Sequence, residues 1–182
     1  MSAELFATYE ERVAQTLAAL GIRATHGKKS GLRIFREAEE LVSVGLDIYE
    51  REQKLAPRGA IAWRELKLAA ERDGVALLLV SAFRSFDYQK QIIERKLATG
   101  IPMEQILRVS AAPGYSEHHT GRAVDVTAPN CKPLTEEFEH TPTFAWLGDR
   151  AKDFGFTMTY PRNNKFGVVY EPWHWVLEET IV

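Results

Sequence analysis

One stretch of the sequence decides the fold class: Val75-Ala76-Leu77-Leu78-Leu79-Val80, followed directly by Ser81-Ala82-Phe83-Arg84-Ser85. The unbroken apolar run is typical of a central, buried strand. The Ser85 side chain is a good N-cap, and it predicts a helix from Phe86 to about Ala98, with Gly100 after its end. The chain therefore passes from a core strand into a helix through a short polar segment.

The neighbouring segments extend this pattern in both directions. Apolar residues at helical spacing predict helices over residues 2–20 with Ser2 as the cap, over 57–72 with Pro57 in the first turn, and over 143–154. Further strands are expected at 32–36, 122–126, 156–160 and 173–177, whereas 37–55 fits either strand or helix. Helices come first and strands then mix with helices, which favours an α+β fold over a doubly wound parallel sheet.

Length and composition restrict the class of protein. The 182 residues fit one domain, 1–182, in which residues 1–40 form a helical N-terminal extension packed on the rest. The single cysteine excludes an internal disulfide and a cysteine-rich zinc site. With 23 basic and 25 acidic residues the net charge is −2, so nucleic-acid binding is not expected. The six-residue apolar run is too short for membrane insertion.

The N-terminal sequence has no basic start followed by an apolar segment, as a signal peptide would. We therefore expect a cytoplasmic protein. A periplasmic or extracellular location is the alternative if a leader has been removed.

Two polar segments carry the candidate chemistry: Ser116-Glu117-His118-His119-Thr120-Gly121-Arg122-Ala123-Val124-Asp125 and Glu171-Pro172-Trp173-His174. They hold three of the five histidines. A hydrolytic zinc site needs three protein ligands, an open position for water, and a nearby carboxylate that takes a proton. Two imidazoles and one carboxylate are available from His118, Asp125 and His174, and Glu171 lies three residues before His174. Taken singly, each of these residues also fits an ordinary polar loop.

The order of these motifs resembles a known family, the D-alanyl-D-alanine and L,D-carboxypeptidases of the VanY/DacB type, in the M15B-like branch of the M15 peptidases. The family pattern S-x-H-x-x-G-x-A-x-D is matched from Ser116 to Asp125, and E-P-W-H is matched from Glu171 to His174. A third pattern, S-x-[YF]-R-S followed by Q, is matched from Ser81 to Gln89. The resemblance runs from about residue 41 to 176. It implies the Hedgehog/DD-peptidase-like fold, with a small central antiparallel sheet flanked by helices.

The resemblance also implies roles for individual residues. The ligands of a zinc ion would be His118, Asp125 and His174. Glu171 would act as general base and then as general acid. Arg84 would contact the carbonyl oxygen or the terminal carboxylate of the substrate, and the residues that help to hold this carboxylate would be Ser116 and Gln89. One departure is His119, where many relatives carry Gln; it is either a rival ligand to His118 or a residue at the rim of the site.

The expected function is a zinc carboxypeptidase that removes the C-terminal D-alanine from peptidoglycan stem peptides. L,D-carboxypeptidase activity on muropeptide tetrapeptides in recycling is the first choice. The alternatives are a D,D-carboxypeptidase acting on pentapeptides, a stem-peptide endopeptidase, and a non-catalytic binding module. The expected partner is the muropeptide substrate, and the sequence leaves the oligomeric state open.

Overall fold

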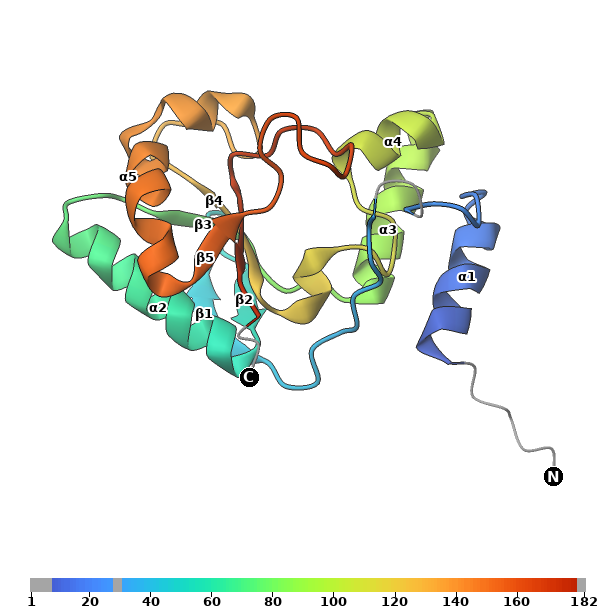
Figure 1. Ribbon diagram of the computed structural model, residues 1–182, viewed down its shortest axis with the longest axis horizontal. Helices are drawn as coiled ribbons and strands as arrows, with labels where there is room; N and C mark the ends of the chain where they lie inside the picture. The colour runs from blue at the N-terminus through green and yellow to red at the C-terminus, as the bar shows by residue number, and fades with distance from the viewer. Residues whose placement is uncertain (1–7, 28–30, 180–182) are drawn as a thin grey trace.

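The main sheet contains four antiparallel strands in the order β3-β4-β6-β5 (Figure 1). Its strands are β3 (Leu78–Ser81), β4 (Ala123–Thr127), β5 (Phe156–Met158) and β6 (His174–Leu177). The computed structural model describes residues 8–27 and 31–179. Helices flank this sheet, so the predicted α+β fold with a small antiparallel sheet is confirmed.

The strand predicted at residues 75–80 differs from the expectation in both bounds and place. It begins at Leu78, and it lies at one edge of the sheet, whereas the fully buried β4 lies inside. The sequence of the edge strand β3 is as apolar as that of a central strand, because a second, two-stranded sheet covers its outer edge. It is the antiparallel hairpin of β1 (Val42–Leu46) and β2 (Glu52–Leu55). Its turn and β2 bond the edge backbone, for example from the Ile48 amide to the Leu79 carbonyl at 3.0 Å.

The β1–β2 hairpin resolves the ambiguous stretch 37–55 as two strands. Asp47 organises its turn, with a side chain that is buried. One carboxylate oxygen accepts from the backbone amides of Tyr49 and Arg51, and the other accepts from Arg51 Nε and Gln53 Nε2 at 2.8 Å each. These bonds hold a hairpin whose own side chains are largely exposed.

Two helices cover one face of the main sheet. The first is α2 (Pro57–Arg72), which has the predicted bounds and buries Trp63, Leu66 and Ala70. The second is α5 (Pro142–Arg150), which continues as a 3₁₀ turn, η3 (Ala151–Phe154), in place of the single predicted helix over 143–154. Their apolar sides and the inner face of the sheet form the larger hydrophobic core.

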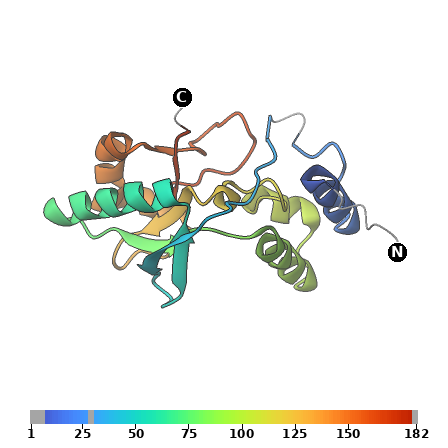
Figure 2. The same cartoon turned by 90° about the horizontal axis from the view of Figure 1, so that it is seen from below.

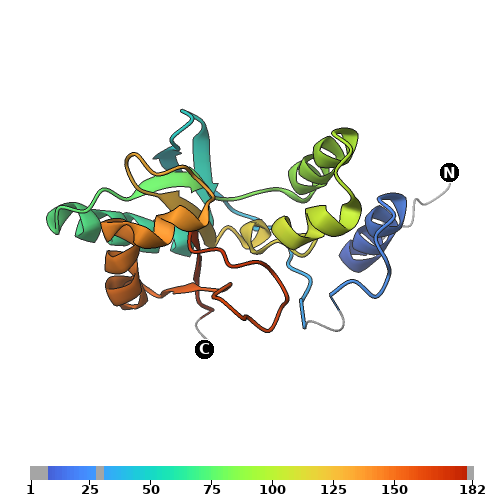
Figure 3. The ribbon, with the colours of Figure 1, turned by 90° about the horizontal axis from the view of Figure 1, so that it is seen from above.

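The remaining helices lie at the other end of the molecule (Figures 2 and 3). They are α1 (Tyr9–Ala19), α3 (Phe86–Ala98), which has the predicted bounds, and α4 (Met103–Val109), which the sequence pattern did not predict. A smaller core joins Val13, Leu17 and Ile22 to Phe86, Ala112 and Tyr115. Thr8 and Glu11 form a capping box at the start of α1; the predicted cap Ser2 lies outside the described residues.

The strand predicted at residues 32–36 is not formed. This segment has no partner strand among the described residues. It runs instead alongside residues 114–119, which we call the motif loop. The Phe35 amide donates to the Gly114 carbonyl at 2.7 Å, and the Ala38 amide donates to the His119 carbonyl at 2.8 Å. None of the helices in the described ranges combines the length and hydropathy that crossing a bilayer requires.

Candidate metal centre

A short 3₁₀ turn presents the first histidine of the site. This turn, η1 (Glu117–Thr120), ends at Gly121, which has a φ of 63° and donates its amide to the His118 carbonyl at 3.2 Å. A Cβ at Gly121 would lie 2.6 Å from the Ala56 nitrogen just before α2. Glycine is therefore required here for both the left-handed backbone and the close packing. The chain then enters β4, which carries Asp125.

The sheet register brings the three predicted ligands together. Asp125 on β4 pairs directly with His174 on β6. Donor atoms of His118, Asp125 and His174 all lie within 4.8 Å of one another, and all three residues are buried. Asp125 Oδ2 lies 3.2 Å from His118 Nε2, and Asp125 Oδ1 lies 2.9 Å from His174 Nδ1. Ligands at 2.0–2.2 Å around a tetrahedral zinc ion are roughly 3.3 Å apart, and the 3.2 Å separation fits this spacing. The 2.9 Å contact has the length of a hydrogen bond, which a bound metal ion would replace.

The hydrogen bonds of His118 show that its inward nitrogen is available to a cation. Nδ1 contacts the Ala82 carbonyl oxygen at 2.5 Å and must donate its proton there. Nε2 is then an unprotonated acceptor, buried and without a hydrogen-bond partner, facing the Asp125 carboxylate. Burial, followed by the charge of Arg84, lowers the pKa of His118 to about 4. Two acceptors that face each other in a buried site are stable only with a cation or a proton between them.

Glu117 orients the second histidine, and sequence reasoning missed this role. Its carboxylate lies 3.0 Å from His174 Nε2, which turns Nδ1 towards Asp125. The side chains of Thr159 and Tyr160 also hydrogen-bond Glu117, and the Tyr160 ring stacks on His174 with 5.2 Å between centroids. Burial alone would lower the pKa of His174, but the hydrogen bonds to both carboxylates outweigh burial and raise it to about 10. A carboxylate that holds the outer nitrogen of a ligand histidine is the usual support of metal sites. The only available signal was the position of Glu117 inside the motif.

Glu171 reaches the same pocket from the turn before β6. The His174 amide donates to the Glu171 carbonyl at 3.1 Å, which closes the turn over Pro172, and the Glu171 amide donates to the Tyr160 carbonyl at 3.0 Å. Burial raises the pKa of the Glu171 carboxyl to about 7. A carboxyl group with this pKa both accepts and returns protons near neutral pH.

The other predicted residues are divided between the pocket and its supports. Arg84 and Ser116 line the pocket, and an Arg84 amino group lies 3.6 Å from Asp125 Oδ2. Gln89 is fully buried, does not line the pocket, and donates to the carbonyl of Ala111, which does. In this arrangement Gln89 holds the pocket wall; its predicted contact with the substrate stays a prediction.

His119 has both ring nitrogens occupied by the backbone. Nε2 accepts from the Gly114 amide at 3.1 Å, so Nδ1 carries the proton that is donated to the Arg84 carbonyl at 2.6 Å. His119 is not part of the group that could hold a metal ion, which consists of His118, Asp125 and His174 and is called the metal-capable group below. It joins the motif loop to the Arg84 segment, which leaves His118 as the ligand candidate from this pair.

The pocket has a volume of about 430 Å³ and is walled by both ends of the molecule. His26 and Leu32 contribute from the N-terminal region, α3 and α4 form one side, and the β5–β6 connection forms another. This connection contacts α4 where the Val169 amide donates to the Arg108 carbonyl at 3.4 Å. Of the two tryptophans beside His174, Trp173 lines the pocket and Trp175 belongs to the core.

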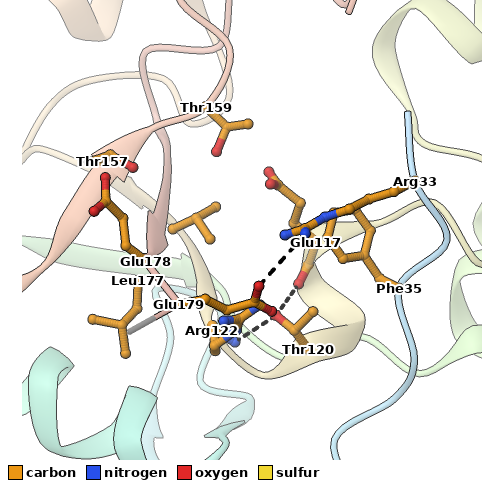
Figure 4. Close-up of a pocket in the computed structure, with 11 residues that line it drawn as sticks. Arg33, Phe35, Glu117, Thr120, Arg122, Thr157, Thr159, Leu177, Glu178 and Glu179 are labelled. Atoms are coloured by element: carbon orange, nitrogen blue, oxygen red, sulfur yellow. Dashed lines mark hydrogen bonds and ion pairs between the residues drawn. The ribbon is translucent and has the colours of Figure 1, made fainter. Parts of the chain in front are cut away.

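The structure has a second cavity of about 300 Å³, whose lining residues are drawn in Figure 4. Glu117 lines both cavities. The walls of the second cavity also carry Arg33 and Arg122, whose charges pair with Glu179 at 3.7 and 2.7 Å. The Glu117 carboxylate therefore stands between the metal-capable group and a second, polar opening.

Comparisons with known proteins agree with this geometry. The family model for VanY, D-alanyl-D-alanine carboxypeptidase, matches residues 52–178. YodJ of Bacillus subtilis (strain 168) is 34% identical over 146 residues, which are 76% of this chain and 53% of that protein. The chain spans about half the length of the curated relatives it matches.

Solved structures give the same result for the fold. The LdcB LD-carboxypeptidase superposes with a TM-score of 0.69 and 31% identity, over 78% of this chain and 69% of that one. A variant of the vancomycin resistance D,D-pentapeptidase VanY, in complex with Zn(II), gives a TM-score of 0.60 and 26% identity, over 81% and 87% of the two chains.

Proposed function

The chain belongs to the VanY family of D-alanyl-D-alanine carboxypeptidases, and from this premise we propose that it is a zinc-dependent carboxypeptidase acting on peptidoglycan stem peptides. One observation carries the proposal. Three buried ligand side chains converge beside a fourth, proton-accepting carboxylate in one pocket, and the inward nitrogen of His118 has no partner there. A binding module would not need Glu171 in this place.

The proposed zinc ligands are His118 through Nε2, Asp125, and His174 through Nδ1. Two nitrogens and one carboxylate oxygen with an open fourth position form the donor set of catalytic zinc sites. The complex of the VanY variant with Zn(II) supports the choice of metal. When bound, zinc supplies a Lewis acid that polarises the scissile carbonyl group and acidifies water.

The proton transfers fall to Glu171. Its carboxylate would accept a proton from the attacking water and then donate one to the nitrogen of the leaving residue. The raised pKa of this buried carboxyl group suits both steps near neutral pH. The proposed role of Glu117 and Tyr160 is to hold the His174 ring in place.

Arg84 is the proposed contact for the substrate oxygen atoms. Its guanidinium group has donors that fit a carboxylate or a developing oxyanion. The two motif histidines hold the Arg84 backbone. Its amide donates to the His118 carbonyl at 3.3 Å, and its carbonyl accepts from His119 Nδ1. Ser116, buried in the same wall, is the proposed second contact.

Within the family, we place the L,D-carboxypeptidase reaction on tetrapeptide stems first. The LdcB LD-carboxypeptidase, at 31% identity and a TM-score of 0.69, supports this choice. The TM-scores do not by themselves separate the two reactions, since the L,D-carboxypeptidase DacB gives 0.56 and the D,D-pentapeptidase VanY gives 0.60. The family description, D-alanyl-D-alanine carboxypeptidase, makes the D,D reaction on pentapeptides the second candidate.

The test is a product assay with zinc-loaded protein on defined tri-, tetra- and pentapeptide stems, read by mass. Release of D-alanine from the tetrapeptide supports the first choice, and release from the pentapeptide supports the second. The Glu171→Gln variant should keep the metal and lose roughly 10²–10⁴-fold in turnover. Zinc-loaded wild-type protein that releases D-alanine from neither stem, or cuts only cross-linked stems internally, would show the proposal to be wrong.

A further inference from the structure

A lysine in the pocket wall has no role in the chemistry described so far. Lys96 lies on α3, is half-buried, and lines the same pocket as Arg84 and Glu171. Its Nζ donates to Ser110 Oγ at 2.6 Å, and Ser110 lines the pocket as well. The ammonium group is thus fixed at one place in the wall by a neutral hydroxyl group.

The positive charge of Lys96 has no acidic partner in ion-pair contact in residues 8–27 and 31–179. Burial lowers its pKa, the charge of Arg84 lowers it further, and Glu171 raises it from a greater distance than an ion pair. Removing an ammonium group from water beside another cation is unfavourable unless an anion compensates for it.

Arg84, which lines the same pocket, also has unused hydrogen-bond donors. Its Nε atom is buried and has no hydrogen-bond partner, and its closest carboxylate oxygen is Asp125 Oδ2, 3.6 Å from one amino group. Two cationic side chains with spare N–H donors therefore face one pocket. A carboxylate has about four acceptor positions and can bind both groups at once.

A carboxypeptidase substrate brings such an anion to this point, because its terminal carboxylate belongs to the residue that leaves. We propose that Lys96, positioned by Ser110, binds the terminal carboxylate of the leaving residue together with Arg84 and so selects chain ends over internal bonds. This inference rests on the proposed function, and it names the substrate group that the site recognises.

The experiment compares a stem peptide that ends in a free D-alanine carboxylate with the same peptide ending in the amide. The variant is Lys96→Met, which keeps the length of the side chain and removes the charge. Lys90→Met is the matched control, because Lys90 is a half-buried lysine on the same helix that does not line the pocket. For Lys96→Met we expect kcat/KM on the free acid to fall roughly 10- to 100-fold, mainly through KM, with little change on the amide. Lys96→Arg should recover part of the loss, and unchanged melting temperatures exclude unfolding.

A binding arm separates this inference from the proposed function. Metal-loaded Glu171→Gln protein is titrated with D-alanyl-D-alanine and with its amide, with and without Lys96→Met. A preference for the free acid that disappears with Lys96 supports the inference, whether or not the wild-type protein releases D-alanine. An equal loss on acid and amide, an unchanged preference, or no binding of the free acid overturns it. A third peptide, amidated on a stem side-chain carboxylate, completes the test. If the Lys96 effect follows that group instead, the terminal assignment is wrong.

Discussion

Replacing Glu117 by Gln tests whether the carboxylate behind His174 supports metal binding. The change keeps the size of the side chain and removes its charge. The bond to His174 Nε2, 3.0 Å long, then passes from a charged to a neutral acceptor. Charge-assisted hydrogen bonds contribute about 1.5–3 kcal/mol and neutral ones about 0.5–1.5 kcal/mol, so roughly 1–1.5 kcal/mol is lost. The amide group must also face the hydroxyl groups of Thr159 and Tyr160 with a donor.

A loss of this size corresponds to about a tenfold weaker metal affinity at 1.4 kcal/mol per factor of ten. It lies at the lower end of the 10- to 100-fold effects seen when a group behind a metal ligand is removed. The assay is a competition titration of zinc against a chromophoric chelator at fixed pH. The control is Glu178→Gln, because Glu178 lines the same second cavity, whereas the side-chain hydrogen bonds of His174 go to Asp125 and Glu117. An unchanged zinc affinity in Glu117→Gln would refute the reasoning, and an equal loss in both variants would point to general electrostatics.

Three further predictions concern stability. In Gly59→Ala, the new Cβ would lie 2.5 Å from the Gly121 carbonyl oxygen, so we expect a loss of roughly 1–3 kcal/mol in chemical denaturation; Gly148→Ala, with nothing within 4 Å, should instead gain up to about 1 kcal/mol. For Asp47, burial would raise the pKa, but the hydrogen bonds from Arg51 and the turn amides outweigh it and hold the pKa below its ordinary value. The stabilising effect of Asp47 is therefore present above about pH 4 and is lost as the pH falls through the folded-state pKa. The free energies of unfolding of Asp47→Ala and wild type should differ by roughly 1–3 kcal/mol at pH 7, and they should converge in acid. A strong chelator should lower the melting temperature, and added zinc should restore it, because a ligand at a thousand times its dissociation constant stabilises the folded state by about 4 kcal/mol. Identical melting temperatures with and without metal would contradict the proposed metal centre.

The sequence predicted best where the signals are local. The helices α2 and α3 have the expected bounds because Pro57 and Ser85 mark their starts and apolar spacing marks their buried sides. The three ligand candidates were recognised from motif order, and the register of β4 against β6 is what brings Asp125 beside His174.

The sequence-based predictions were wrong or ambiguous where contacts between residues far apart in the chain determine the structure. Residues 32–36 alternate like a strand, yet their backbone bonds go to the Gly114 loop, and no local pattern reveals the missing partner strand. The β1–β2 hairpin was ambiguous because its apolar face is small, consisting of Val42, Val44 and Leu55, and because no local pattern reveals the bonds by which Asp47 holds its turn. Glu117 looked like an ordinary loop carboxylate, since its importance comes from His174, which lies 57 residues further along the chain.

The wall of the pocket has two different origins in the chain. The metal-capable group lies within the matched range 52–178, whereas His26 and Leu32 come from the region before it. Mutations in that N-terminal region can change the shape of the pocket mouth without altering a ligand or its supports. In evolution, substrate preference could therefore diverge among relatives while the reaction is inherited unchanged. Replacing His26 and Leu32 by the residues that relatives carry at these positions is a direct way to look for such divergence.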